Sequence, residues 1–182
     1  VLWTLAAEAA FNSAVLVSLA VCLAATAGIP MGLWLALWSP RWLRAPLESV
    51  VSIGITAPAF FFVFVLQLGA IGLAERTART VLPVFGYGLD GHLVIPVLAL
   101  TLAPFAFIAR SVALFASEAM DRDYIRTARA KGLPEVAIAG RHLLPNILGS
   151  TGETLLGAVR LTLGAVVIVE YVLVWPGLGL LG

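Results

Sequence analysis

The chain has 182 residues, of which 61% are hydrophobic and only 12% are charged. Soluble domains are about 45–50% apolar, so this composition, with a mean hydropathy of +1.04, excludes a soluble domain. The single cysteine, Cys22, lies in an apolar stretch, which excludes a disulfide framework and a thiol-rich metal site. We therefore expect an all-α, polytopic membrane protein.

Four segments are long and apolar enough to cross a bilayer as helices, which takes about 20 residues each. They cover residues 11–38, 47–73, 93–117 and 147–174. We expect them to form a single transmembrane domain over residues 1–182. Pro30 lies inside the first span and is expected to kink it, because proline removes one backbone donor.

Basic residues in the short loops predict the orientation of the spans. The first loop, 39–46, has two basic residues and the third, 118–146, has five. The second loop, 74–92, has two arginines together with Glu75 and Asp90. Because cytoplasmic loops are enriched in Lys and Arg, we place residues 39–46 and 118–146 in the cytoplasm.

Small residues recur every four positions in the first and last spans. They are Ala20, Ala24, Gly28, Gly32 and Ala36 in the first, and Ser150, Thr154, Ala158 and Thr162 in the last. Such a stripe allows close approach of another helix. The stripes serve either packing within this chain or an interface with a second membrane subunit, and the sequence leaves both open.

Ionisable residues in the last span are candidates for a translocation path, because charges at bilayer depth normally face a bundle interior or water. Glu153 and Arg160 are seven residues apart and share a helix face, where they line the path or form a structural ion pair. Glu170 lies near the outer surface of the membrane, where its side chain is expected to reach water by snorkelling. Gln67 in the second span lines the path or forms an interhelical hydrogen bond.

The 118–146 segment predicts a helix, a sharp turn and a second helix. Acidic residues at 121–123 suit a helix start, Gly132 suits the left-handed position after a helix end, and Pro134 suits the first turn of the next helix. Pro145 marks the return to the membrane.

The sequence offers no chemistry of its own. Lys131 is the only lysine and is followed by Gly132, which rules out a GxxxxGK[ST] phosphate loop. His92 and His142 fall in loops assigned to opposite sides of the membrane, so we expect no metal site. GxSxG and HExxH motifs are absent from the sequence. We expect neither catalysis nor a cofactor in this chain.

The 118–146 loop also carries part of a known motif. In register with EAA-x3-G-x9-I-x-LP, the chain has Arg126-Thr127-Ala128, Gly132, His142 and Leu144-Pro145. The final Ala, the Gly and the LP match, whereas the leading Glu and Ala and the Ile do not. The chain resembles the permeases of binding-protein-dependent ABC importers. The variant DYxRTARAKGL is typical of the dipeptide/oligopeptide/nickel permease branch.

Three further stretches are similar to that branch, and they occur in the same order. They are GIPMG at 28–32, LPVFGY at 82–87 and EYVLVWPGLG at 170–179. The resemblance implies a type I importer permease in a bacterial or archaeal plasma membrane, with six spans in the full chain and four of them here. Di- or oligopeptides are the expected cargo, and nickel or another small solute is the alternative.

The resemblance implies that the loop is a coupling element that docks on a cytoplasmic ATPase. The residues expected to carry this contact are Tyr124, Arg126, Thr127, Ala128, Arg129, Lys131, Gly132, Arg141, His142, Leu144 and Pro145. The implied partners are two ATP-binding cassette subunits that hold ATP and Mg²⁺, a second related permease and an external substrate-binding protein. Nucleic acid is not among them.

Two other interpretations of the sequence remain. An ion-gradient-driven secondary transporter would use Glu153, Arg160 and Glu170, and its uptake would survive ATP depletion. A non-transporting scaffold would bind a cytoplasmic protein through the same loop without any flux.

Overall fold

The computed structural model describes residues 2–77 and 82–181, and every regular element in these ranges is helical. The elements are α1 (Leu2–Leu37), α2 (Arg41–Thr56), α3 (Ala59–Thr77), η1 (Gly91–Leu93), α4 (Val94–Met120), α5 (Asp123–Ala130), α6 (Glu135–Ile138), the π-helical turn η2 (Ala139–Leu143), α7 (Leu144–Leu173) and η3 (Leu178–Leu180). The helical fold class predicted from composition is confirmed.

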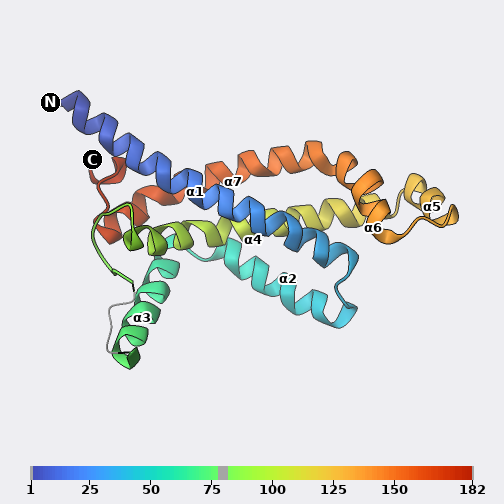
Figure 1. The fold of residues 1–182 in the computed structure, drawn as a ribbon, viewed down its shortest axis with the longest axis horizontal. Helices are drawn as coiled ribbons and strands as arrows, with labels where there is room; N and C mark the ends of the chain where they lie inside the picture. The colour runs from blue at the N-terminus through green and yellow to red at the C-terminus, as the bar shows by residue number, and fades with distance from the viewer. Residues whose placement is uncertain (1, 78–81, 182) are drawn as a thin grey trace.

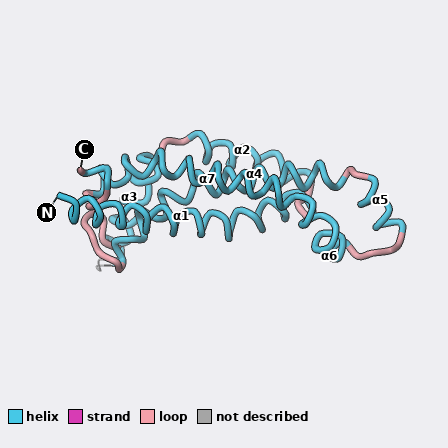
Figure 2. Tube along the Cα trace, turned by 90° about the horizontal axis from the view of Figure 1, so that it is seen from above, coloured by secondary structure: helices cyan, strands magenta, loops and turns pink. Residues whose placement is uncertain are grey.

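Helix α4 is the centre of the bundle. It contacts α1, α2, α3 and α7, and α1, α4 and α7 run alongside one another in both views (Figures 1 and 2). Helices α5 and α6 project at one end of the molecule, while both chain ends lie at the other. Four helical segments are long and apolar enough to cross a membrane: 2–37, 59–77, 91–120 and 135–173.

The small-residue stripe of α1 packs against α4. Ala20, Ala24, Gly28 and Gly32 are buried. A Cβ at Gly32 would lie 2.5 Å from the carbonyl oxygen of Ala109, so only glycine allows this approach. Buried Ala158 and Thr162 of α7 likewise lie on the inner side of their helix. The stripes therefore serve packing within this chain.

The expectation of one continuous span over 47–73 is wrong, because the chain breaks between α2 and α3. Ala57 is extended (φ −69°, ψ 132°), and its N–H closes α2 on the carbonyl of Ile53. Pro58 follows it. Proline disfavours helical dihedrals in the preceding residue and lacks an N–H to donate. In Figure 1, α3 leaves the direction of the other long helices.

The predicted loop 39–46 is also shorter than expected, because α2 already begins at Arg41. The side chains of Arg41 and Arg44, on which the orientation partly depends, lie outside the described part of the structure, as does all of Arg79. Pro30 lies inside α1, which remains helical through it. The last two spans differ from their predicted bounds by at most three residues.

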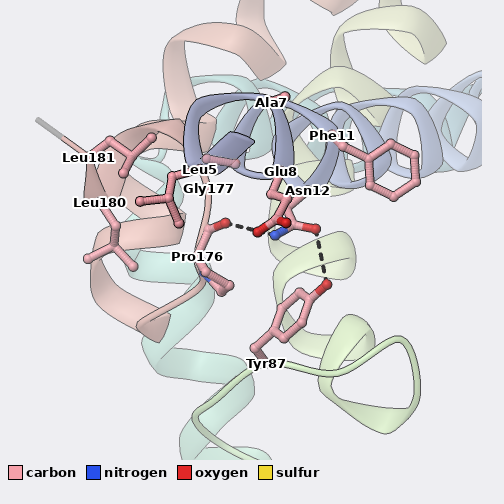
Figure 3. A pocket seen from close by; sticks show the side chains of 11 residues that line it. Leu5, Ala7, Glu8, Phe11, Asn12, Tyr87, Pro176, Gly177, Leu180 and Leu181 are labelled. Carbon is pink, nitrogen blue, oxygen red and sulfur yellow. Dashed lines mark hydrogen bonds between the residues drawn. The ribbon is translucent and has the colours of Figure 1, made fainter. Parts of the chain in front are cut away.

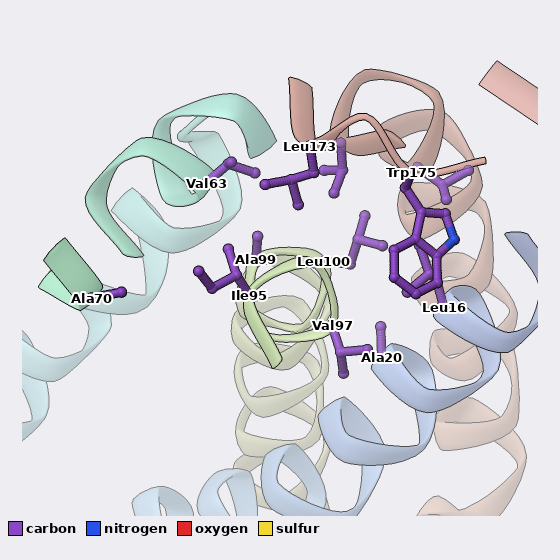
Figure 4. Packing of buried hydrophobic residues seen from close by; sticks show 12 residues of the cluster. Leu16, Ala20, Val63, Ala70, Ile95, Val97, Ala99, Leu100, Leu173 and Trp175 are labelled. Carbon is purple, nitrogen blue, oxygen red and sulfur yellow. The ribbon is translucent and has the colours of Figure 1, made fainter. Parts of the chain in front are cut away.

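Two apolar clusters hold the bundle together. One, at the end where the termini lie, joins Leu16, Val63, Leu100 and Trp175 among others (Figure 4). The second, nearer the α5 end, is built around α4 and includes Ile108, Val112, Leu143 and Ile147.

Candidate functional site

The turn that follows α5 has a complete Schellman geometry. Gly132 adopts φ +74°. Its N–H donates to the carbonyl of Arg129 (2.9 Å), and the N–H of Leu133 donates to the carbonyl of Ala128 (3.3 Å). These two bonds satisfy carbonyls that the end of a helix leaves unpaired. The left-handed turn predicted at Gly132 is confirmed.

A small apolar core supports the 118–146 loop from inside. Ile125, Ala128 and Ile138 are buried together, and Met120 and Leu133 pack against them. The five side chains come from the end of α4, from α5, from the turn and from α6. The loop is therefore a packed body with its own core, and α5 and α6 are held at a fixed position relative to α4.

An ion pair closes the two short helices across the turn. Arg129 donates from Nε to Glu135 Oε1 (2.8 Å) and from Nη2 to Oε2 (3.3 Å). The hydrogen bond to Glu135 raises the pKa of Arg129 above its ordinary value, against the opposing effect of desolvation. Both side chains remain about half exposed, so the pair adds geometric definition and little stability.

Helix α6 is not a separate element, contrary to the expectation of a short second helix followed by re-entry at Pro145. It continues through η2 into α7, so that residues 135–173 form one helical segment. Pro145 is the second residue of α7 and lies inside this segment, directly after the π-helical turn. The π-helical turn accommodates one wider winding where α6 meets α7.

The residues expected to contact an ATPase differ in their exposure. Those exposed at the surface are Tyr124, Arg126, Thr127, Arg129, Lys131, Gly132, Arg141 and Pro145. His142 and Leu144 are half-buried, and Ala128 is buried in the small core of the loop. Ala128 therefore holds the loop together from inside and does not present a surface to a partner.

The three predicted path residues lie apart from one another. Gln67 is buried and donates from Nε2 to the carbonyl of Val84 (3.1 Å), which is the role of a packing hydrogen bond. Glu153 and Arg160 are exposed on α7. None of the three lines the larger hollows found in the described part of the chain.

Glu170 is fully buried, so the snorkelling interpretation is wrong. Its carboxylate accepts hydrogen bonds from Ser13 Oγ of α1 and from the N–H of Gly179 (2.8 Å). Ser13 Oγ in turn accepts from the N–H of Leu178 (2.9 Å). A Cβ on Gly177 would overlap the Glu170 carboxylate. The EYVLVWPGLG stretch is thus a clasp that ties the end of α7 to α1.

A cavity of about 630 Å³ lies beside this clasp, between the first turns of α1 and the segment after α7 (Figure 3). Asn12 closes one side, because its Nδ2 donates to the carbonyl of Pro176 (2.8 Å) and its Oδ1 accepts from the Tyr87 hydroxyl (3.0 Å). Glu8 and Phe11 also line it. The ring of Tyr87 packs edge-on against Trp175, with centroids 4.8 Å apart.

The prediction of site residues missed Arg110. It lies on α4 and lines a groove of about 870 Å³ between α1, α2 and α4. Its Nη1 donates to Ser52 Oγ of α2 (3.1 Å). Glu48, Ser49 and Ser117 line the same groove. The signal was available, since Arg110 is the single charged residue of the span predicted at 93–117.

Comparison with known proteins shows the family. A model of the family described as "Binding-protein-dependent transport system inner membrane component" matches residues 28–182. The chain belongs to this family of membrane components of binding-protein-dependent transport systems. The resemblance drawn from the sequence motifs is confirmed.

Several relatives carry names of peptide transport systems. The Escherichia coli K12 protein named "Probable D,D-dipeptide transport system permease protein DdpB" is 32% identical over 88% of this chain and 54% of its own length. A glutathione transport system permease of Shigella flexneri is 33% identical over 76% of this chain and 44% of its own length. A Brucella ovis protein named as a peptide permease is 31% identical over 71% and 42%. The chain thus spans about half the length of these relatives.

Proposed function

We propose that this chain is a permease subunit of a peptide importer whose 118–146 loop couples it to cytoplasmic ATPase subunits. The observation that carries the proposal is the packed internal structure of the loop. It is a body with its own apolar core, it is closed by the Arg129–Glu135 pair, and it is joined to α7 by an unbroken helix. Such a body can transmit a displacement to the membrane helices without absorbing it.

Peptides are the cargo class that the relatives favour. Their names refer to peptides, to D,D-dipeptides and to glutathione. In the proposed complex, two ATP-binding cassette subunits hold ATP and Mg²⁺, a second related permease completes the path, and an external binding protein delivers the peptide. This chain supplies no catalytic group. The loop, the turn between α1 and α2 and the start of α2 face the cytoplasm of a bacterial or archaeal cell.

The exposed face of the loop is suited to a protein partner. Tyr124 and Val136 present apolar surface, with 38% and 73% of each residue exposed. Arg126, Lys131 and Arg141 of the same loop are exposed as well. Exposed aromatic and apolar residues together with charged ones are the usual composition of a docking surface.

Replacement of Gly132 tests the coupling role. A β-branched residue at φ +74° is strained by roughly 1–2 kcal/mol or more, whereas asparagine tolerates this conformation. In vesicles containing the full complex, Gly132→Val is expected to abolish ATP-driven dipeptide uptake while membrane insertion stays normal. Gly132→Asn, the matched control, is expected to keep most of the uptake. Space is not the issue, because a Cβ here meets no described atom within 4 Å.

Three measurements separate this proposal from its rivals. Wild-type uptake must require ATP, and an ATPase subunit must co-purify with the chain in mild detergent. Normal uptake by Gly132→Val would contradict the coupling role. Uptake that survives ATP depletion but stops with an uncoupler would point to an ion-driven transporter.

A further inference from the structure

The Arg110 groove combines charged and hydroxyl-bearing side chains. It is lined by two charged residues, Arg110 and Glu48, and by three serines, Ser49, Ser52 and Ser117. Arg110 lies about 15 Å along the axis from the end of α4 at Met120, well inside the apolar helix. The groove therefore brings charge to a depth at which the rest of α4 is apolar.

A charge at this depth demands water or a polar partner. Insertion scales assign an arginine at the centre of a membrane helix a penalty large enough that such residues face a bundle interior or a water-filled cavity. The polar partner that the structure provides is Ser52 of α2, whose Oγ accepts a hydrogen bond from Arg110 Nη1 (3.1 Å). We take the groove to be water-filled in the assembled transporter.

The guanidinium group of Arg110 has capacity for a ligand. It carries five N–H donors in a planar fork that matches a carboxylate. Among the described residues, the hydrogen bond to Ser52 is the one bond that it makes. Glu48 of α2, which also lines the groove, offers a carboxylate that suits an ammonium group. A volume of about 870 Å³ falls within the range of about 300–1,000 Å³ typical of small-molecule sites.

We infer that this groove is a cargo site, in which Arg110 binds the terminal carboxylate of a short peptide in transit. The inference rests on the proposed function, since it names the group of the peptide that the permease recognises. Arg110 is the binding residue, and Ser52 positions its guanidinium group. The apolar residues Leu35, Ile53 and Leu114 line the remainder of the groove and suit peptide side chains.

Thiol labelling tests the site without altering Arg110. The exposed native cysteine is removed as Cys22→Ser, and a new thiol is placed in the groove as Ala113→Cys. The full complex in vesicles is treated with negatively charged sulfonatoethyl methanethiosulfonate or with its positively charged trimethylammonium analogue. Leu89→Cys, an exposed position outside the membrane-spanning helices that does not line the groove, is the control.

Four results are expected. The groove thiol reacts with the water-soluble reagents, and it reacts faster with the negative one. Dialanine, supplied with the binding protein, slows this labelling but leaves the Leu89→Cys control unchanged. Arg110→Gln removes the preference for the negative reagent. The same variant raises the half-protecting dialanine concentration about 10- to 100-fold, the range for losing a charge-assisted hydrogen bond.

Arg76→Gln is the matched variant, because Arg76 is an exposed arginine at the end of α3 that does not line the groove. It should leave both the charge preference and the protection unchanged. Arg110→Lys keeps the charge without the planar fork, so it should keep the charge preference and show intermediate protection.

Several outcomes would overturn the inference. Labelling that dialanine does not slow, in vesicles that take up dialanine, excludes the groove as a cargo site and leaves the importer role intact. Labelling that occurs only when the second permease is omitted shows instead that a partner protein covers Arg110. Failure of wild-type vesicles to take up dialanine contradicts the proposed function itself.

Discussion

At the scale of single residues, Glu170 shows how one buried carboxylate organises a chain end. It has no exposed surface, and both of its oxygens accept hydrogen bonds, from Ser13 Oγ and from the N–H of Gly179. A buried charge without such partners would cost several kcal/mol. The two glycines of the WPGLG stretch leave room for it, because side chains at Gly177 or Gly179 would meet the Glu170 side chain.

Gly177→Ala is expected to destabilise the protein by about 1–3 kcal/mol, the usual range for overpacking. The new methyl group displaces the Glu170 carboxylate from Ser13. Gly164→Ala on α7, where a Cβ meets no described atom within 4 Å, is the control and should be neutral or slightly stabilising. Both variants are purified in mild detergent, and their free energies of unfolding are measured by titration with a denaturing detergent.

A double variant checks the cause of this loss. Adding Glu170→Ala to Gly177→Ala removes the overlap, so the two losses should sum to more than the loss in the double variant. Strict additivity would show that Gly177 acts through its backbone and not through Glu170.

At the scale of elements, the close packing of α1 against α4 depends on glycines of α1, which have no side chain. Gly28 and Gly32 face α4, where a Cβ on Gly32 would lie 2.5 Å from the Ala109 carbonyl oxygen and 2.7 Å from Val112 Cβ. Such close approach gains dispersion energy and backbone contacts, which drive helix association where the surrounding lipid is as apolar as the side chains.

Gly32→Ala should therefore separate α1 from α4 and lower the free energy of unfolding. Alanine gains about 0.5–1 kcal/mol over glycine in a helix, but overpacking against a backbone oxygen costs about 1–3 kcal/mol, so the loss outweighs the gain. Gly69→Ala on α3, an exposed position with open space, isolates the helix-propensity gain. Equal free energies of unfolding for Gly32→Ala and Gly69→Ala would show that α1 and α4 adjust to the added methyl group at little cost.

Prolines show how far an element can be predicted from its sequence. Pro30 and Pro104 lie inside continuous helices, whereas Pro58 separates two helices. The local sequence is similar in kind at all three, since each lies in an apolar run. What differs is the packing around the helix, since α1 and α4 pack against each other along much of their length. The break at Pro58 therefore could not be predicted from the local sequence.

The candidate site was predictable where its causes are local. The helix end at Gly132 depends on residues within a few positions and follows from turn and cap chemistry. The burial of Glu170 depends on Ser13, 157 residues away. The groove around Arg110 depends on α2, which no rule of spacing places beside α4.

At the scale of the whole molecule, one helical segment joins the 118–146 loop to the far end of the bundle. Residues 135–173 run without a break from α6 to the clasp at Glu170. The cavity lined by Asn12 and Tyr87 lies beside this far end of α7.

Interrupting this helix should uncouple transport from ATP hydrolysis. Insertion of Gly-Ser-Gly between Gly140 and Arg141 leaves the small loop core and the bundle core in place. Dipeptide uptake is expected to fall roughly 5- to 150-fold, the range of a lost coupling free energy, while ATP hydrolysis by the complex continues. The same insertion between Gly88 and Leu89, outside this helix, is the control. Unchanged uptake in the first variant would mean that coupling takes another route.

The clasp also fixes an order of events during biosynthesis. Asn12 and Ser13 are bonded to residues 176 and 178, which lie 164 and 165 positions later in the chain. These bonds cannot form until nearly all of this sequence has left the ribosome, long after α1 has entered the bilayer. The polar groups near the start of α1 must remain hydrated throughout that interval. Closure of the clasp therefore follows the synthesis of α7.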